Sequence, residues 1–230
     1  NAGKQSKASP KTSAANPTPT QHGKQRYIDQ LDQLSANHRV DELRKGARDA
    51  TYIAGRMALA GQITVFFASP NTGKTLLVLN LISEAIANGT LGPHVYHLNM
   101  DDSYEGLIEK TDLGNRHGFK VLGPDVVTRP RENFNEIVMR LVNEGSAGEA
   151  VLVLDTLKKF VDVMDKKDST SFMNTCRMFT MAGGSIIALA HTNKHTGEDD
   201  RGIPAGTSDI KDDCDSAYVL GVIEESSVEA

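Results

Sequence analysis

The segment ASPNTGKT at residues 68–75 places a lysine and a threonine behind a run of small, turn-forming residues. In a phosphate-binding loop, backbone N–H groups point at phosphate oxygens, the lysine reaches the β- and γ-phosphates, and the threonine hydroxyl binds Mg²⁺. A strand must precede this loop and a helix must follow it, and the apolar runs ITVFFAS and TLLVLNLISEAIANG supply both. We therefore expect a nucleotide to contact Ala68, Ser69, Pro70, Asn71, Thr72, Gly73, Lys74, Thr75 and Leu76.

One position of this segment departs from the usual loop. Ala68 stands where the first glycine belongs. That position ends a strand and mainly needs a small side chain, so alanine fits there if its φ is negative. The alternative to a nucleotide site is a chance Gly-Lys-Thr turn.

Acidic residues follow two other apolar strands. In VLVLDT, Asp155 is expected to orient Mg²⁺ together with Thr75. In HLNMDDS, Asp101 and Asp102 are candidates for the group that deprotonates an attacking water. Asp102 or Ser103 could instead cap the following helix, so we favour Asp101 as the base.

Polar residues also follow the strand SIIALAHTN at 185–193. His191 is placed to detect the γ-phosphate, although a histidine at a strand end can be purely structural. Among the cations that follow, Lys194, Arg201 and Lys211 could each stabilise transition-state charge on a neighbouring subunit's nucleotide. The alternative for each such cation is a solvated surface charge.

The order of elements predicts an α/β fold. Near-continuous apolar strands alternate with helical segments, which is typical of a mostly parallel sheet with helices on both faces. The predicted strands are 63–69, 94–100, 150–157, 185–193 and 216–224, with a short one at FKVLGP. In doubly wound sheets, ligands bind at the carboxyl ends of strands, where the residues discussed above lie.

Composition divides the chain into three parts. Residues 1–26 hold five Lys/Arg and no acid, and we expect a disordered basic linker. Residues 27–60 are expected to form a helical lead-in, and residues 61–230 the core that contains the candidate nucleotide site. The chain lacks an initial methionine, which suggests a part of a longer polypeptide. With no signal segment or long apolar run, we expect a cytoplasmic protein that does not enter membranes.

The motifs ASPNTGKT, LNMDDSYEGL, VLVLDT, AHTNK and AGTSDIKDDCDSAYVL together resemble the RecA-like P-loop ATPase superfamily. The hexameric replicative helicases and RepA-like plasmid replication ATPases look closest, with the DNA-repair RadA proteins as more distant relatives. The resemblance covers about 61–224. It implies Mg-ATP hydrolysis at subunit interfaces of a hexameric ring or filament. It also implies that Lys74 and Thr75 hold the phosphates and Mg²⁺, that Asp155 is the Walker B acid and that His191 is the polar sensor at a strand end.

The same resemblance places the family's catalytic glutamate at Asp101, one methylene shorter. It also implies a cation that acts in trans, for which Arg201 is our first choice. It places DNA-contacting loops at 159–170 and 196–210, where Lys158, Lys159, Lys166 and Lys167 cluster. The leading hypothesis is an ATP-driven motor acting on single-stranded DNA in replication or repair. Against DNA binding, residues 27–230 carry 20 Lys/Arg and 30 Asp/Glu, once the five basic residues of the linker are removed from the total of 25. The alternative is an ATP-dependent switch or scaffold without nucleic acid; a small-molecule kinase ranks last because no arginine-rich lid is evident.

Overall fold

The computed structural model describes residues 21–41, 44, 51–125, 127–196, 202–204 and 208–222. The chain divides into two compact units, Asn1–Asp49 and Ala50–Ala230. In the first unit, helix α1 (Gln21–Leu34) precedes a 3₁₀ turn, η1 (Ala36–Arg39). Helix α1 begins inside the stretch 1–26 that we expected to be disordered linker, and residues 1–20 of that stretch lie outside the described residues.

The second unit is built on a six-stranded parallel sheet of order β5-β4-β6-β7-β3-β9. An additional short strand, β8, pairs antiparallel with β7. The strands of the unit are β1 (Tyr52–Ala54), β2 (Ala58–Leu59), β3 (Ile63–Ala68), β4 (Val95–Asn99), β5 (Lys120–Leu122), β6 (Val151–Asp155), β7 (Ser185–Thr196), β8 (Gly202–Pro204) and β9 (Ser216–Leu220).

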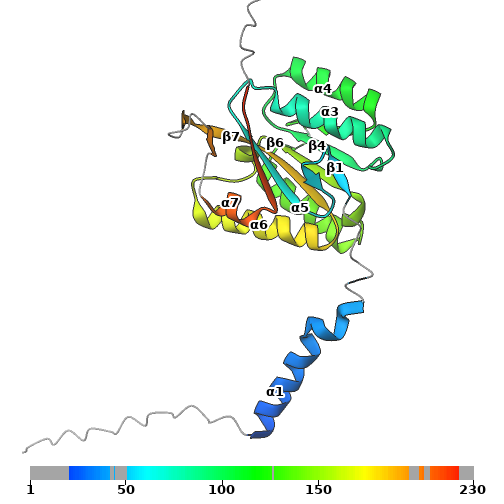
Figure 1. The fold of residues 1–230 in the computed structure, drawn as a ribbon, viewed down its shortest axis with the longest axis vertical. Helices are drawn as coiled ribbons and strands as arrows, with labels where there is room; N and C mark the ends of the chain where they lie inside the picture. The colour runs from blue at the N-terminus through cyan, green and yellow to red at the C-terminus, as the bar shows by residue number, and fades with distance from the viewer. Residues whose placement is uncertain are drawn as a thin grey trace, which may run out of the picture. The chain divides into compact units, whose positions relative to one another are not determined.

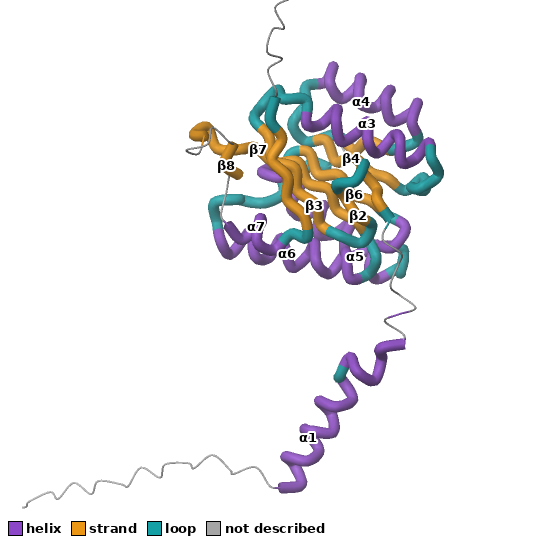
Figure 2. Tube along the Cα trace, in the orientation of Figure 1, coloured by secondary structure: helices purple, strands orange, loops and turns teal. Residues whose placement is uncertain are grey.

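Helices cover both faces of this sheet (Figures 1 and 2). Helices α3 and α4 lie on one face, and α5, α6 and α7 lie on the other. Their bounds, with those of the short 3₁₀ turns, are α3 (Lys74–Ala87), α4 (Tyr104–His117), α5 (Pro130–Asn143), η2 (Ala147–Glu149), η3 (Leu157–Lys159), α6 (Lys166–Met181) and α7 (Ser208–Asp213). The predicted α/β class, with a mostly parallel sheet covered on both sides, is confirmed.

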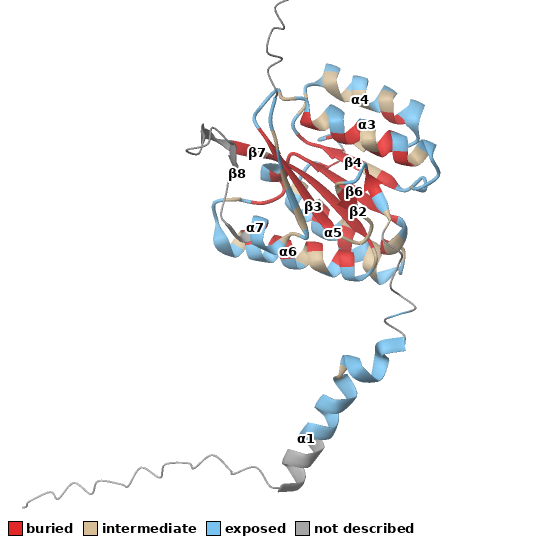
Figure 3. Ribbon diagram, in the orientation of Figure 1, coloured by how far each residue is buried: buried red, intermediate tan, exposed pale blue. Residues whose placement is uncertain are grey.

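The central strands of the sheet are buried because they are apolar on both sides (Figure 3). Successive side chains of a strand point to opposite faces. Accordingly, Val65 and Phe67 of β3 pack into the core beneath α5 and α6, whereas Phe66 between them packs with α3. This arrangement brings the carboxyl ends of β3, β4, β6 and β7 to one edge of the sheet.

The lead-in predicted as helical over 27–60 is wrong at its carboxyl end. Strands β1 and β2 form an antiparallel hairpin there, with Tyr52 opposite Leu59. Ile53 is buried and packs in the cluster that contains α3. The helical spacing of apolar residues that motivated the prediction ended at Leu43, and the aromatic and β-branched residues that follow favour a strand.

Phe134 of α5 is expected to be one of the strongest single contributors to stability. It is fully buried, and its ring lies 5.3 Å from that of Phe172 and 6.0 Å from that of Phe160, measured between centroids. Phe134→Ala should lower the free energy of unfolding by about 3–5 kcal/mol because it leaves a cavity. Urea denaturation followed by circular dichroism measures this. Met139→Ala, at a 44% exposed position of the same helix, is the control; equal losses in both variants would contradict the prediction.

Candidate nucleotide site

The loop after β3 runs directly into the N-terminus of α3. Ala68, the last residue of β3, is fully buried, and its φ is not positive, so alanine is compatible with this strand end. Asn71, with φ 62°, is the only non-glycine residue of the described chain in the positive-φ region. Gly73, with φ 78°, forms the N-cap of α3. A side chain would be strained at that φ, so glycine lets the loop turn into the helix.

The N-terminus of α3 is open to a ligand. No side chain caps it, so the first N–H groups of the helix have no cap acceptor. Lys74 is only 9% exposed, yet its ammonium makes no ion pair or hydrogen bond with the described residues. The charge of Lys74 acts on Asp155 without a direct contact, so the ammonium can still take a ligand, and a helix N-terminus attracts negative charge. Both features fit a bound anion such as a phosphate group.

Asp155, at the end of β6, lies beside this helix N-terminus. Its Oδ2 accepts a hydrogen bond of 2.9 Å from Oγ1 of Thr75, and Nε2 of His97 lies 3.3 Å from the same oxygen. Burial raises the pKa of Asp155, but the His97 and Thr75 hydrogen bonds and the Lys74 charge more than offset this, so the pKa is lowered. The carboxylate is therefore charged at neutral pH. Its contribution to stability is present above the unfolded-state pKa and is lost as pH falls through the lower folded-state value.

His97 was missed by sequence reasoning. It is fully buried in the middle of β4, and its Nδ1 has no hydrogen-bond partner in the described part of the chain. A polar ring at such a position stabilises less than an aliphatic side chain would, unless it supports something else. The signal was present in HVYHLNM: His97 and Asn99 occupy alternate positions, so two polar side chains point to one face of a buried strand.

The two carboxylates after β4 have different surroundings. Oδ2 of Asp102 accepts a hydrogen bond of 2.7 Å from Nδ2 of Asn99 and also contacts Nζ of Lys110. The helix cap is Ser103, whose Oγ accepts from the N–H of Gly106. Asp101 makes longer contacts only, so its carboxylate is the freer of the two to accept a proton.

Three cationic or titratable groups surround Asp101. Nζ of Lys159 lies 3.7 Å and Nζ of Lys158 lies 4.0 Å from its Oδ1, and Nε2 of His191 lies 3.8 Å from its Oδ2. The pKa of His191 is lowered by burial and by the nearby charges of Lys74 and Lys158, although Asp101 and Asp155 act in the opposite direction. His191 is therefore mostly neutral near pH 7, and it can donate or accept a hydrogen bond rather than act as a fixed charge.

These residues line one cavity of about 430 Å³. Its lining contains most of the predicted site: Pro70, Asn71, Gly73, Lys74, Thr75, Leu76, Asp101, Asp155 and His191. It also contains Asp102, the less favoured candidate for the base, and three residues that we did not assign to the nucleotide site: Glu109, Lys110 and Lys158. Three predicted loop residues, Ala68, Ser69 and Thr72, do not line it.

Ser69 and Thr72, which do not line the cavity, make hydrogen bonds that hold the loop in its conformation. Oγ1 of Thr72 donates to the carbonyl of Ser69 at 2.9 Å, and Oγ of Ser69 lies 3.1 Å from Oγ1 of Thr192 on β7. The loop is thereby fixed to itself and to the neighbouring strand. Arg201, our choice for the trans-acting cation, lies outside the described residues.

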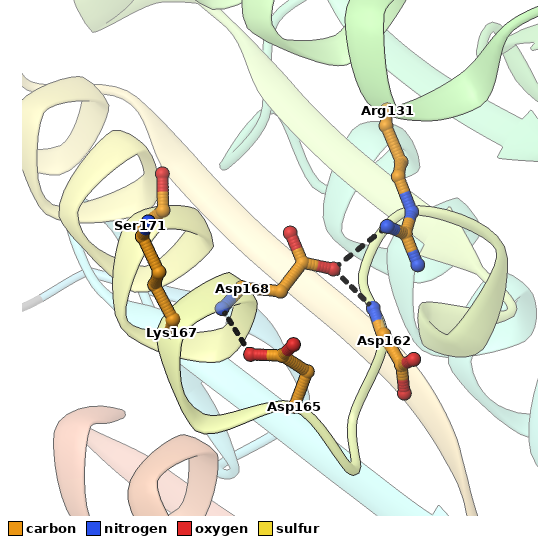
Figure 4. Close-up of a pocket in the computed structure, with 6 residues that line it drawn as sticks. All are labelled: Arg131, Asp162, Asp165, Lys167, Asp168 and Ser171. Atoms are coloured by element: carbon orange, nitrogen blue, oxygen red, sulfur yellow. Dashed lines mark hydrogen bonds and ion pairs between the residues drawn. The ribbon is translucent and has the colours of Figure 1, made fainter.

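A second cavity, of about 390 Å³, lies in the segment 159–170 that we expected to contact DNA (Figure 4). Asp168 is at its centre: its Oδ2 pairs with Nη1 of Arg131 at 2.8 Å and accepts the N–H of Asp162 at 2.6 Å. Oδ1 of Asp165 accepts the N–H of Asp168 and caps α6. The segment holds three lysines and three aspartates, so it carries no net positive charge for a phosphate backbone.

The fold and site define an α/β protein whose helix N-terminus, buried lysine and strand-end carboxylates meet in one cavity. No protein-family model matches the sequence, and no curated protein is significantly similar to it. No helix in the described part of the chain is long and apolar enough to cross a membrane. Within that part, no group of three or more His, Cys, Asp or Glu side chains could hold a metal ion.

Proposed function

We propose that this protein binds Mg-ATP and hydrolyses it as a RecA-like P-loop ATPase. The observation that carries the proposal is Lys74, a largely buried residue at the uncapped N-terminus of α3 that lines the cavity and makes no hydrogen bond or ion pair with the described residues, next to the hydrogen-bonded pair of Thr75 and Asp155. The first feature suits a phosphate chain, and the second suits Mg²⁺. The parallel sheet, with all of these residues at one edge, supports the RecA-like assignment.

The residues present suit a Mg²⁺ ion that is shared with the substrate. Thr75 and Asp155 offer one hydroxyl and one carboxylate, and Mg²⁺ commonly takes its remaining ligands from phosphate oxygens and water. When bound there, Mg²⁺ would neutralise phosphate charge. The role of the chain is to keep Asp155 ionised and oriented, through His97 and Thr75.

Hydrolysis requires a base near the terminal phosphate. Lys74 and the N–H groups of α3 hold the phosphates and neutralise charge that grows on them. Asp101 accepts a proton from the water that attacks the terminal phosphorus of ATP. The bond between that phosphorus and the oxygen bridging to the β-phosphate breaks, and ADP leaves. His191 lies close enough to Asp101 to respond to the presence of the terminal phosphate.

We further propose that the ATPase works as a homo-oligomer, a hexameric ring or filament, and that hydrolysis is coupled to single-stranded DNA. These proposals rest on the family resemblance, with Arg201 as the cation acting in trans. The balanced charge of segment 159–170 favours the alternative, an ATP-dependent switch or scaffold that does not bind nucleic acid.

Phosphate release from ATP tests these proposals. The purified protein should hydrolyse ATP with Mg²⁺ and lose this activity in EDTA. Adding single-stranded DNA at about 50 and 200 mM salt separates the DNA motor from the switch that does not bind nucleic acid. Stimulation of ATP hydrolysis that weakens as salt rises supports the motor, because protein contacts to DNA phosphates are salt-sensitive. Hydrolysis without any effect of DNA supports the switch. Absence of both ATP binding and hydrolysis would overturn the proposal.

His97→Leu is expected to weaken the Mg²⁺-dependent part of ATP binding by about 10–100-fold, because Asp155 loses a partner that orients it. Titrating Mg²⁺ into the protein with a fluorescent ATP analogue measures this effect. His97→Gln, which keeps an N–H donor, should recover part of the loss. The control is His94→Gln, at an exposed position where the side chain contacts Glu149 and Tyr96. Equal Mg²⁺ affinity in wild type and His97→Leu would show that His97 is structural only.

A further inference from the structure

Lys158 is one of three lysines that line the nucleotide cavity, and it comes from an element distant in sequence from the phosphate-binding loop. The other two are Lys74 and Lys110, and Nζ of Lys110 contacts Asp102. Lys158 belongs to η3, the turn that follows β6. Lys159 is its neighbour in the chain and carries the same charge, but it is not part of the cavity lining. We had expected both lysines to belong to a DNA-contacting loop.

The contact between Lys158 and Asp101 is one that a ligand can replace. The Nζ–Oδ1 distance of 4.0 Å exceeds that of a hydrogen bond, and the two side chains are 52% and 35% exposed. An ion pair of this kind is weak because solvent screens it. A phosphate group bears more charge than a carboxylate and offers more acceptor oxygens, and a lysine is a common phosphate ligand.

The position of Asp101 indicates which phosphate Lys158 would meet. If Asp101 activates the attacking water, it must lie close to the terminal phosphate, and Lys158 is within 4.0 Å of Asp101. Lys74 and Lys158 also both lower the pKa of His191, so the two ammonium groups act on the same region of the cavity. The phosphate chain would thus be held between the N-terminus of α3 and the turn after β6.

We infer that Lys158 binds the terminal phosphate of the nucleoside triphosphate, and that this contact takes Lys158 away from Asp101. The carboxylate then has one cation fewer beside it and accepts a proton more readily, although Lys159 stays 3.7 Å from its Oδ1. The inference rests on the proposed function. It gives the site a cation from the same subunit that distinguishes ATP from ADP, independent of any residue that acts in trans.

A pair of adjacent lysine variants tests this inference. Lys158→Met should weaken binding of a non-hydrolysable ATP analogue by about tenfold while leaving ADP affinity within about twofold of wild type. Lys159→Met should change neither affinity by more than about twofold, since its ammonium faces Asp101 from outside the cavity lining. Displacement of a fluorescent nucleotide in the presence of Mg²⁺ gives both dissociation constants, and Lys158→Arg should restore most of the preference for the triphosphate.

Three results would overturn the inference. Equal losses for the ATP analogue and ADP in Lys158→Met would show a general charge effect, and equal losses in Lys159→Met would remove the distinction between the two lysines. Unchanged ATP-analogue affinity in Lys158→Met would exclude the contact. These outcomes leave the proposed function in place when wild type binds both nucleotides; a wild type that binds neither would refute the proposed function itself.

Discussion

Replacing Lys74 with methionine is expected to lower ATP hydrolysis by about 10²–10³-fold and to weaken nucleotide binding strongly, because the phosphates lose their buried counter-charge. Methionine keeps an unbranched chain of similar length, so the packing of the lysine stem is largely preserved. Lys74 makes no close ion pair with the described residues, and its charge acts on Asp155 only at longer range, so removing that charge should lower the melting temperature of the nucleotide-free protein only slightly.

That combination separates a ligand-binding lysine from a structural one. The measurements are phosphate release, nucleotide titration and thermal unfolding of the free protein. Lys120→Met is the control: this lysine is exposed on β5, where its ammonium donates to the carbonyl of Pro93. Substantial hydrolysis by Lys74→Met would contradict the site, and a large fall in its melting temperature without ligand would indicate that the ammonium supports the fold.

Much of the fold could be predicted because its local signals agree with its tertiary structure. The strand predicted at 63–69 is β3 (Ile63–Ala68), and the helix predicted at 75–89 is α3 (Lys74–Ala87). Both segments are apolar over nearly their whole length, and this is the pattern of elements buried in a parallel sheet. The hairpin of β1 and β2 was missed because its strands are three and two residues long, too short for any period to be visible.

The part of the candidate site that is formed by residues adjacent in sequence was predictable. Gly73, Lys74 and Thr75 act through one loop, and their types and order indicate a phosphate site without knowledge of the sheet. Asp155 could be added because it ends an apolar strand, and parallel strands bring their carboxyl ends to one edge.

Contacts between strands that are distant in sequence were not predictable in the same way. His97 reaches Asp155 because β4 pairs with β6, and the order of strands cannot be read from the chain. Lys158 and Lys159 differ in their relation to the cavity although they are adjacent, because a 3₁₀ turn points successive side chains in different directions. Sequence spacing alone treats both lysines as one basic cluster.

Replacing Asp101, the proposed base, is expected to have the second large effect on hydrolysis. Asp101→Asn should reduce hydrolysis by about 10²–10⁴-fold, because the amide cannot accept the proton of the attacking water. ATP affinity should stay the same or rise, since a negative charge near the phosphates is removed. Asp101→Glu should hydrolyse ATP at least as fast as wild type: its longer side chain restores the reach of the glutamate that the resemblance places here. Single-turnover hydrolysis and nucleotide titration measure the two effects separately.

The neighbouring carboxylate provides the comparison that decides between the two candidates. Asp102 is held by Asn99 at the end of β4 and by Lys110 of α4, so its carboxylate is engaged by two side chains, whereas Asp101 makes longer contacts. Asp102→Asn should therefore change hydrolysis far less than Asp101→Asn does. A larger loss in Asp102→Asn would reverse the assignment. Slow hydrolysis in Asp101→Glu, with unchanged binding, would mean that the short side chain of Asp101 is matched to this cavity, where Lys158 and His191 already approach its carboxylate within 4.0 Å.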